Sequence, residues 1–248
     1  MSEQPYKRPP ITEAVIELRF DTPIDAAVLD SASSDFNLDY PLHVPLRNVG
    51  FQLDVPPGAE DSPTARINQQ ENGHRRSSSD LSEIVLLWPG SFVVAQLAPY
   101  LGWDAFFERF TRDWIIWKKV TGYRKIIRVG VRFINRIDIP FTSRVIEESD
   151  YLNVYPKLPD VLGPVASYGI QAQVPITDID CNLVINSASV RSPLLGHGSI
   201  ALDLDIFRER NAPQRDEDIY NLLNIIRTKK NEIFEACITN KARELFRT

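Results

Sequence analysis

The most constraining feature of the sequence is a stretch near its middle, residues 126–139, which reads IIRVGVRFINRIDI. Apolar and charged side chains alternate along it, and alternate side chains of a β-strand point to opposite faces of the sheet. The alternation therefore predicts one long strand with an apolar face and an arginine-lined face. The apolar face would carry Ile127, Val129, Val131, Phe133, Ile137 and Ile139, and the other face Arg128, Arg132 and Arg136.

A similar order of elements precedes and follows this stretch. Alternating patterns predict strands over 11–20, 51–55, 83–88 and 91–97 before it, and over 169–175, 179–185 and 200–206 after it. Apolar residues at helical spacing predict long helices over 103–120 and 216–236. Each half thus reads strand, long connection, three strands and long helix, which indicates an internal duplication.

The predicted fold is α+β, with one antiparallel sheet of about eight strands and the two long helices on one face. The chain would be a single domain, 1–248, made of two pseudo-repeats, about 11–122 and 124–247, related by a pseudo-twofold axis. A short helix over 23–29, a connecting loop over 37–48 and a mobile loop over 56–80 complete the first half. Residues 56–80 have almost no apolar side chains, so burial cannot offset the entropy of ordering them.

Charge and composition limit the classes of function. The net charge of −5 argues against broad electrostatic binding of nucleic acid, which normally shows as an excess of basic residues. The N-terminal residues MSEQPYKRPP contain no apolar signal segment. No window approaches the ~18 apolar residues of a membrane span. We therefore expect a cytoplasmic protein that does not engage a membrane.

The arginines Arg128, Arg132 and Arg136 are the first candidate site, because a spacing of four places them on one face of a strand. Two interpretations are open. In the first, they pair across the sheet with carboxylates, each pair contributing roughly 0.2–1 kcal/mol. In the second, they bind an anion or a protein partner, because guanidinium groups suit phosphate and carboxylate. The carboxylates available for pairing are Glu13, Glu17, Asp203 and Asp205.

Three residues of the predicted helices are further candidates. Lys230 falls inside the apolar stripe of the last helix, between Ile226 and Ile233. Its amine would extend to solvent, meet a buried acid or face a substrate. Ile115 and Ile116 flank the aromatic stripe of the first long helix. They predict an interface with the other long helix or with another chain.

Metal-ligand and thiol chemistry have few candidates. Asp203 and Asp205 point the same way from one strand, which is a geometry that a divalent metal could use. The three histidines are far apart in sequence, and none has a cysteine or an acid at metal-ligand spacing. We therefore expect no metal site from them and no cofactor. Cys181 and Cys237 fall in apolar patterns typical of buried free thiols, in preference to a disulfide or a nucleophile.

Four segments together resemble a known family. They are PPITEAVIELRF at 9–20, YLGWDAFFERF at 100–110, VRFINRIDIP at 131–140 and IFEACITNKARELF at 233–246. They are similar to a sporadically distributed family of uncharacterised bacterial and archaeal proteins of about this length. The likeness runs over 9–246 except 56–80, and the family supplies no catalytic residues to carry over. Its patchy distribution resembles that of accessory genes on mobile elements, which implies a setting in antiviral defence or as toxin–antitoxin cargo.

Several classes of function follow. We favour a non-catalytic binding protein that holds a protein partner, or another copy of the chain, on the open sheet face, the helix edge or the loop 56–80. The motivation is that no catalytic constellation stands out. The alternative is a nucleotide- or metal-dependent enzyme that uses the arginine face, with Asp203 and Asp205 as metal ligands or acid–base groups. A third class, a nucleic-acid-binding sheet platform, is disfavoured by the acidic balance.

Overall fold

The computed structural model describes residues 6–54, 64–141, 146–163 and 165–247. These residues form one antiparallel sheet of nine strands together with four helices, so the α+β prediction is confirmed. Along the sheet the strand order is β2-β3-β4-β5-β1-β6-β9-β8-β7. The opening strand and the long central strand, β1 and β6, therefore lie side by side and antiparallel in the middle.

The bounds of the elements follow the chain. The strands are β1 (Ile11–Phe20), β2 (Leu42–Asp54), β3 (Thr64–Ser77), β4 (Glu83–Trp88), β5 (Ser91–Leu97), β6 (Ile126–Pro140), β7 (Gly169–Ile176), β8 (Cys181–Val190) and β9 (His197–Arg208). The helices are α1 (Ala26–Asp35), α2 (Trp103–Thr121), α3 (Asp216–Cys237) and α4 (Asn240–Arg247). None of these four helices combines the length and the apolar character that crossing a bilayer requires.

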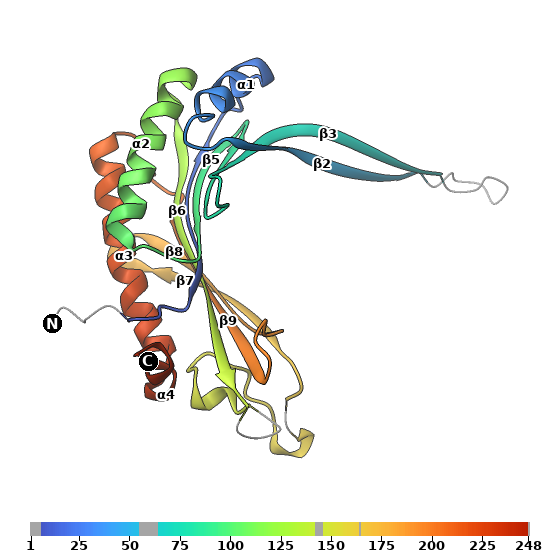
Figure 1. Cartoon of the computed structure of the whole chain (residues 1–248), viewed down its shortest axis with the longest axis vertical. Coiled ribbons are helices and arrows are strands. Elements are labelled where there is room, and N and C mark those ends of the chain that lie inside the picture. Colours follow the sequence, from blue (N-terminus) through green and yellow to red (C-terminus); the bar gives the residue numbers. More distant parts are fainter. Residues whose placement is uncertain (1–5, 55–63, 142–145, 164, 248) are drawn as a thin grey trace.

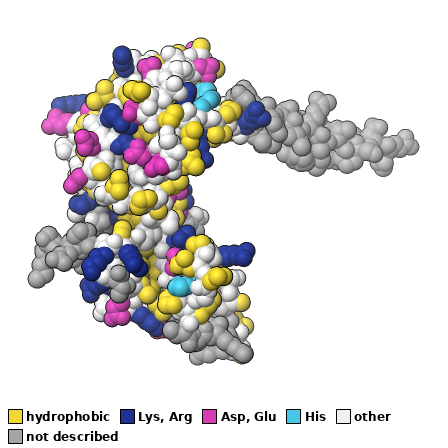
Figure 2. All heavy atoms as spheres, viewed as in Figure 1, with side chains coloured by type: hydrophobic (Ala, Val, Ile, Leu, Met, Phe, Trp, Pro, Cys, Tyr) yellow, Lys and Arg dark blue, Asp and Glu magenta, His cyan; other side chains and the backbone are white. Residues whose placement is uncertain are grey.

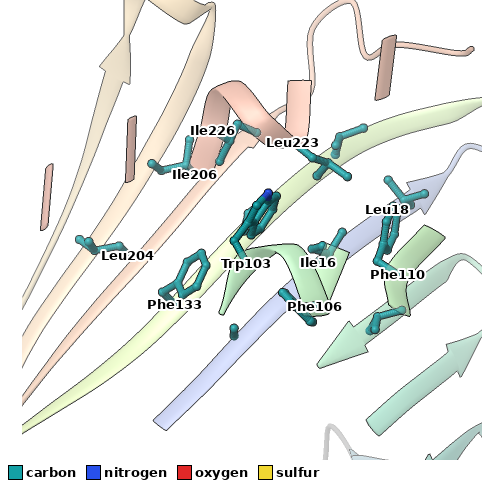
Figure 3. Close-up of a cluster of buried hydrophobic side chains, with 14 of the residues drawn as sticks. Ile16, Leu18, Trp103, Phe106, Phe110, Phe133, Leu204, Ile206, Leu223 and Ile226 are labelled. Carbon is teal, nitrogen blue, oxygen red and sulfur yellow. The ribbon is translucent and has the colours of Figure 1, made fainter. Parts of the chain in front are cut away.

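The two long helices, α2 and α3, run along the same face of the sheet (Figure 1). The aromatic stripe predicted for α2 points at the sheet, and Trp117 is fully buried with stacked contacts to Phe20 of β1 and Phe92 of β5. Burial of this apolar surface, at roughly 25 cal/mol per Å², is the main driving force for the layer pair. Figure 3 shows side chains of both layers packed together, namely Ile16, Leu18, Trp103, Phe106, Phe110, Phe133, Leu204, Ile206, Leu223 and Ile226.

Hydrogen bonds from tryptophan side chains fasten α2 to α3. The indole Nε1 of Trp103 donates to Oδ1 of Asn224 at 2.8 Å, and that of Trp114 donates to Oδ1 of Asp216 at 2.9 Å. Lys118 also forms an ion pair with Asp216. The two helices therefore act as one cover for the sheet.

The first half of the chain departs from the sequence prediction between β1 and β4. Residues 42–48 of the predicted connecting loop (37–48), and most of those predicted as a mobile loop (56–80), form the antiparallel pair β2 and β3. The prediction considered only side-chain burial, whereas backbone hydrogen bonds can order a two-stranded ribbon without an apolar face. Residues 56–63 of the predicted loop, and residue 55 of the strand predicted over 51–55, lie outside the described residues. Helix α1 ends at Asp35, later than the predicted 23–29.

One side chain of the central strand also differs from the prediction. Ile127 was expected on the buried face, but it is 41% exposed, and Ile126 takes the buried position. The pairing of β1 with β6 shifts register between Arg19 and Phe20, opposite this point. Such an irregularity inserts one residue and reverses the alternation locally. Beyond it, the predicted apolar positions from Val129 to Ile139 are buried.

A charged cluster lies inside the helix layer. Tyr40, which follows α1, is fully buried, and its hydroxyl donates to Oδ2 of Asp113 on α2. Arg109 and Arg112 each donate to the same hydroxyl oxygen at 3.0 Å. Burial raises the pKa of Asp113, while Tyr40 and Arg112 oppose the rise. The cluster fixes the segment between α1 and β2 to the side of α2.

We predict that Tyr40→Phe lowers the free energy of unfolding by about 1–3 kcal/mol, because it leaves a buried carboxylate and two guanidinium groups without their shared partner. Urea unfolding of the purified variant measures this change. Tyr155→Phe is the matched control, since Tyr155 is 36% exposed and should change stability by no more than about 0.5 kcal/mol. Equal effects from the two substitutions would contradict the role given to the Tyr40 hydroxyl.

Candidate binding face

The face of the sheet that points away from α2 and α3 carries no helix among the described residues, and we call it the open face (Figure 1). It is concave, because the β2–β3 ribbon projects from one end of the sheet and the lower ends of β6 and β9 project on the same side at the other end. In the space-filling view the described surface is recessed between the base of the β2–β3 ribbon and the lower ends of β6 and β9 (Figure 2). The predicted arginines Arg128, Arg132 and Arg136 all lie on this face, spaced along β6.

Arg128 is the most enclosed of the three arginines, with 6% of its surface exposed. Its guanidinium lies over Gly130, where an added Cβ would come within 2.5 Å of Nη1. It also stacks 4.3 Å from the ring centroid of Phe207. On one side it forms an ion pair with Glu17 of β1, and on the other Nη2 donates to Asp205 of β9 at 2.8 Å. Arg128 thus links three adjacent strands across the middle of the sheet.

Arg132 and Arg136 are also bound to carboxylates. Arg132 makes a two-pronged contact with Asp203, with Nε and Nη2 donating at 2.8 and 2.7 Å. This contact raises the pKa of Arg132. Nε of Arg136 donates to Asp138 of its own strand at 3.1 and 3.2 Å. Arg128 and Arg132 therefore pair across the sheet with expected carboxylates, whereas Arg136 pairs within its own strand with Asp138, which was not among them. Glu13 forms none of the described ion pairs.

The predicted metal candidates, Asp203 and Asp205, do share the open face, but they form ion pairs with Arg132 and Arg128. Asp203 also accepts from Nδ2 of Asn186 at 2.9 Å. Burial raises the pKa of Asp205, and Arg128 opposes the rise. Within the described residues no group of three or more metal-ligating side chains could hold an ion. A metal or phosphate would have to break these ion pairs before it could bind here.

Lys230 lies on α3, on the opposite side of the sheet from Arg128, Arg132 and Arg136. It is buried, and its Nζ sits 4.0 Å from the ring centroid of Phe133. Burial, reinforced by Arg227, lowers its pKa to about 8. Its ammonium group contacts the face of the Phe133 ring. It forms no salt bridge with a carboxylate of the described residues. Lys230 therefore neither extends to solvent nor pairs with a buried acid, which were two of the predicted alternatives.

The two predicted interface residues differ in exposure. Ile115 is 56% exposed on α2, whereas Ile116 is half-buried against the hydrophobic core. Ile115 alone therefore remains available on the outer surface of this helix. Both cysteines are free and buried, as the apolar patterns indicated, and burial raises the pKa of Cys237 to about 11.

Two groupings escaped the sequence analysis. His43 of β2 and His74 of β3 lie side by side, with Nε2 of His43 and Nδ1 of His74 at 3.0 Å, and His74 is 2.9 Å from Asp30. Nothing in the sequence spacing signals this approach, because it depends on the unexpected ribbon. The cluster at Tyr40 did leave a signal, since Arg109 and Asp113 fall within the aromatic stripe of α2 at a spacing of four.

The chain matches no family model, and no curated protein matches it. The resemblance to the sporadically distributed family therefore stays a prediction.

We predict that Gly130→Ala destabilises the protein by about 1–3 kcal/mol, because the new methyl group occupies the space of the Arg128 guanidinium. Thermal or urea unfolding measures the change. Gly90→Ala is the matched control, since nothing lies within 4 Å of a Cβ added there. If Gly130→Ala is no more harmful than Gly90→Ala, the guanidinium does not need the surface of Gly130.

We predict that Lys230→Met stabilises the protein near neutral pH by roughly 3 kcal/mol, since a pKa lowered from 10.5 to about 8 reflects the cost of burying the charge. Between pH 8 and 10.5 the unfolded chain holds this proton more tightly than the folded one. Wild-type stability therefore rises with pH in that window, and the advantage of methionine shrinks.

Urea unfolding at pH 7 and pH 10 measures both effects of Lys230→Met. Lys229→Met is the control, because Lys229 forms ion pairs with Asp178 and Glu232 and gains nothing from losing its charge. A Lys230→Met advantage that stays constant across this pH range would show that the buried charge is not its origin.

Proposed function

We propose that the protein is a non-catalytic binding protein that engages a protein partner on the open face. The observation that supports this most is the concave face that no helix of the described residues covers, in which Arg128, Arg132 and Arg136 are already paired with carboxylates. Protein interfaces combine apolar area with satisfied polar groups and disfavour free charge at their centre. A pre-formed concave sheet also avoids much of the ordering cost of association.

The side chains between the ion pairs favour a protein partner over an anion. Val15 of β1, Ile134 of β6 and Val184 of β8 point to the open face and are half-buried, so they offer apolar contact area between the charged groups. Arg132 keeps 47% of its side chain exposed while Asp203 holds it in place. An arginine fixed in this way is typical of residues that contribute strongly to protein interfaces. The net charge of −5 also disfavours a phosphate backbone as the ligand.

The arrangement of strands supports the further proposal that the chain arose by internal duplication. In each half a meander returns to pair with its own opening strand, β5 with β1 and β9 with β6, and a long helix follows. The two opening strands pair with each other, as a pseudo-twofold axis requires. The concave face would then be built from both repeats. A cytoplasmic location, and a defence or toxin–antitoxin setting, complete the proposal.

The test replaces apolar side chains of the open face with lysine. In an Ile134→Lys, Val184→Lys double variant, each lysine lies directly across from a carboxylate, Asp203 or Asp205, so the fold should tolerate it. Affinity capture from the native host, read by mass spectrometry, should yield a stoichiometric partner with the wild type. The double variant should bind that partner at least about tenfold more weakly, because it places charge in an apolar contact.

Ile115→Lys on the outer surface of α2 is the matched control and should retain the partner. Circular dichroism confirms that each variant remains folded. Loss of binding with Ile115→Lys, and not with the open-face variant, would move the interface to the helix layer. Recovery of no stoichiometric partner by the wild type would contradict the proposal.

A further inference from the structure

The strand β7 forms one edge of the sheet, with β8 on one side and no described strand on the other. Its sequence, GIQAQVPI, contains no charged residue, and most of its side chains are exposed. Proteins usually protect such edges with charges, proline or a covering element, because unpaired N–H and C=O groups recruit another strand. The opposite edge, β2, carries Pro45 and Arg47 within its length, whereas β7 carries only Pro175, next to its last residue. An uncharged, exposed edge at β7 therefore needs an explanation.

The backbone groups that point outward from β7 follow from its pairing. The N–H of Ser189 donates to the C=O of Tyr168 at 3.0 Å, and these residues are directly opposite, one step before the pair of Gly169 and Ala188. In an antiparallel ladder, hydrogen-bonded and non-bonded pairs alternate. The even-numbered residues of β7 therefore bond to β8. Outward-facing backbone groups belong to Gly169, Gln171, Gln173 and Pro175.

These outward groups are complementary to themselves. A twofold axis through Ala172 would place Gln171 opposite Gln173 of a second copy, and Gly169 opposite Pro175 of that copy. Every outward N–H, from Gly169, Gln171 and Gln173, then meets an outward C=O. Pro175 has no N–H to offer, but in this register only its C=O is required. The strand can thus add a copy of itself over its full length.

The side chains fit the same register. The small Ala172 would meet its own copy at the axis, where the strands approach most closely. On the helix side Ile170 would lie opposite Val174, which is 44% exposed, so apolar surface would be covered. On the open side the glutamines would lie opposite each other, with Gln171 already held by Asn186 at 2.7 Å. No like charges would face one another, because the strand has none.

We propose that β7 is the interface of a homodimer, in which antiparallel pairing of two β7 strands about Ala172 joins both sheets into one. The interface is separate from the open face, whose proposed partner could bind to each copy of the dimer. An interface made by one strand edge is small, so we expect a micromolar dissociation constant. The concave faces of the two copies would then lie on the same side of a continuous sheet.

The first test measures mass by sedimentation velocity from about 1 to 300 μM, a range that spans a micromolar dissociation constant. The wild type should shift from the mass of one chain to that of two. Gln173→Pro removes an outward N–H that β8 does not use, and should abolish the shift. Gln173→Ala keeps the N–H and should retain it. A wild type that stays monomeric throughout, or a Gln173→Pro variant that dimerises as well as Gln173→Ala, would overturn the proposal.

The second test fixes the register by disulfide formation under mild oxidation. Paired Cα atoms at a non-hydrogen-bonded position are about 4.5 Å apart, within the range of a disulfide. Ala172→Cys should therefore link to its own copy. Gln171→Cys alone should not, but a mixture of Gln171→Cys with Gln173→Cys should. The buried Cys181 and Cys237 should leave the wild type unlinked.

Either of two results would count against the twofold pairing. Equal self-linking of Gln171→Cys and Ala172→Cys would exclude the register. If Ala172→Cys fails to link while Gln173→Pro loses a different captured protein, β7 recruits a foreign strand and the homodimer is wrong. Binding at the open face is tested by the Ile134 and Val184 substitutions, so failure of one proposal leaves the other intact.

Discussion

The central strands of the sheet depend on the contact between the guanidinium of Arg128 and the backbone at Gly130. Arg128 lies over Gly130, 4.3 Å from the ring centroid of Phe207 and with carboxylates of β1 and β9 at its two sides. Its charge is largely removed from water, and such a charge is tolerated only when it is paired and hydrogen-bonded. The glycine permits this, because any side chain there would occupy the same space. The junction between the two halves is thus held by electrostatics on one face and by the aromatic core on the other.

The two faces of the sheet are thus stabilised by different interactions. The helix face gains its stability from buried aromatic and aliphatic side chains, and its buried charges include the cluster around Tyr40 and Lys230. The open face has no second layer among the described residues, so its strands are held by pairs of opposite charge with half-buried valine and isoleucine between them. A surface of that kind is rigid before any partner arrives. The ion pairs of Arg128, Arg132 and Arg136 also make it selective against simple anions.

Sequence reasoning succeeded where one physical signal dominates. The alternation in β1, β4, β5 and β6 and the aromatic stripe of α2 report burial, and burial follows from composition and spacing. It failed over β3 and over β2 up to the strand predicted at 51–55, because backbone pairing leaves no trace in side-chain pattern. It also failed at Ile127, because a register shift reverses the alternation. The arginine face was located correctly. Which carboxylate meets which arginine depends on strand order and register, which the sequence does not contain.

The four tryptophans of the chain are divided unequally between the two faces. Trp103, Trp114 and Trp117 are buried under α2, whereas Trp88 is half-buried on the open side, against Gly73. An aqueous quencher would therefore reach Trp88 before the other three indoles. Fluorescence from this one ring offers an intrinsic optical reporter for occupancy of the concave surface, without any label added to the protein.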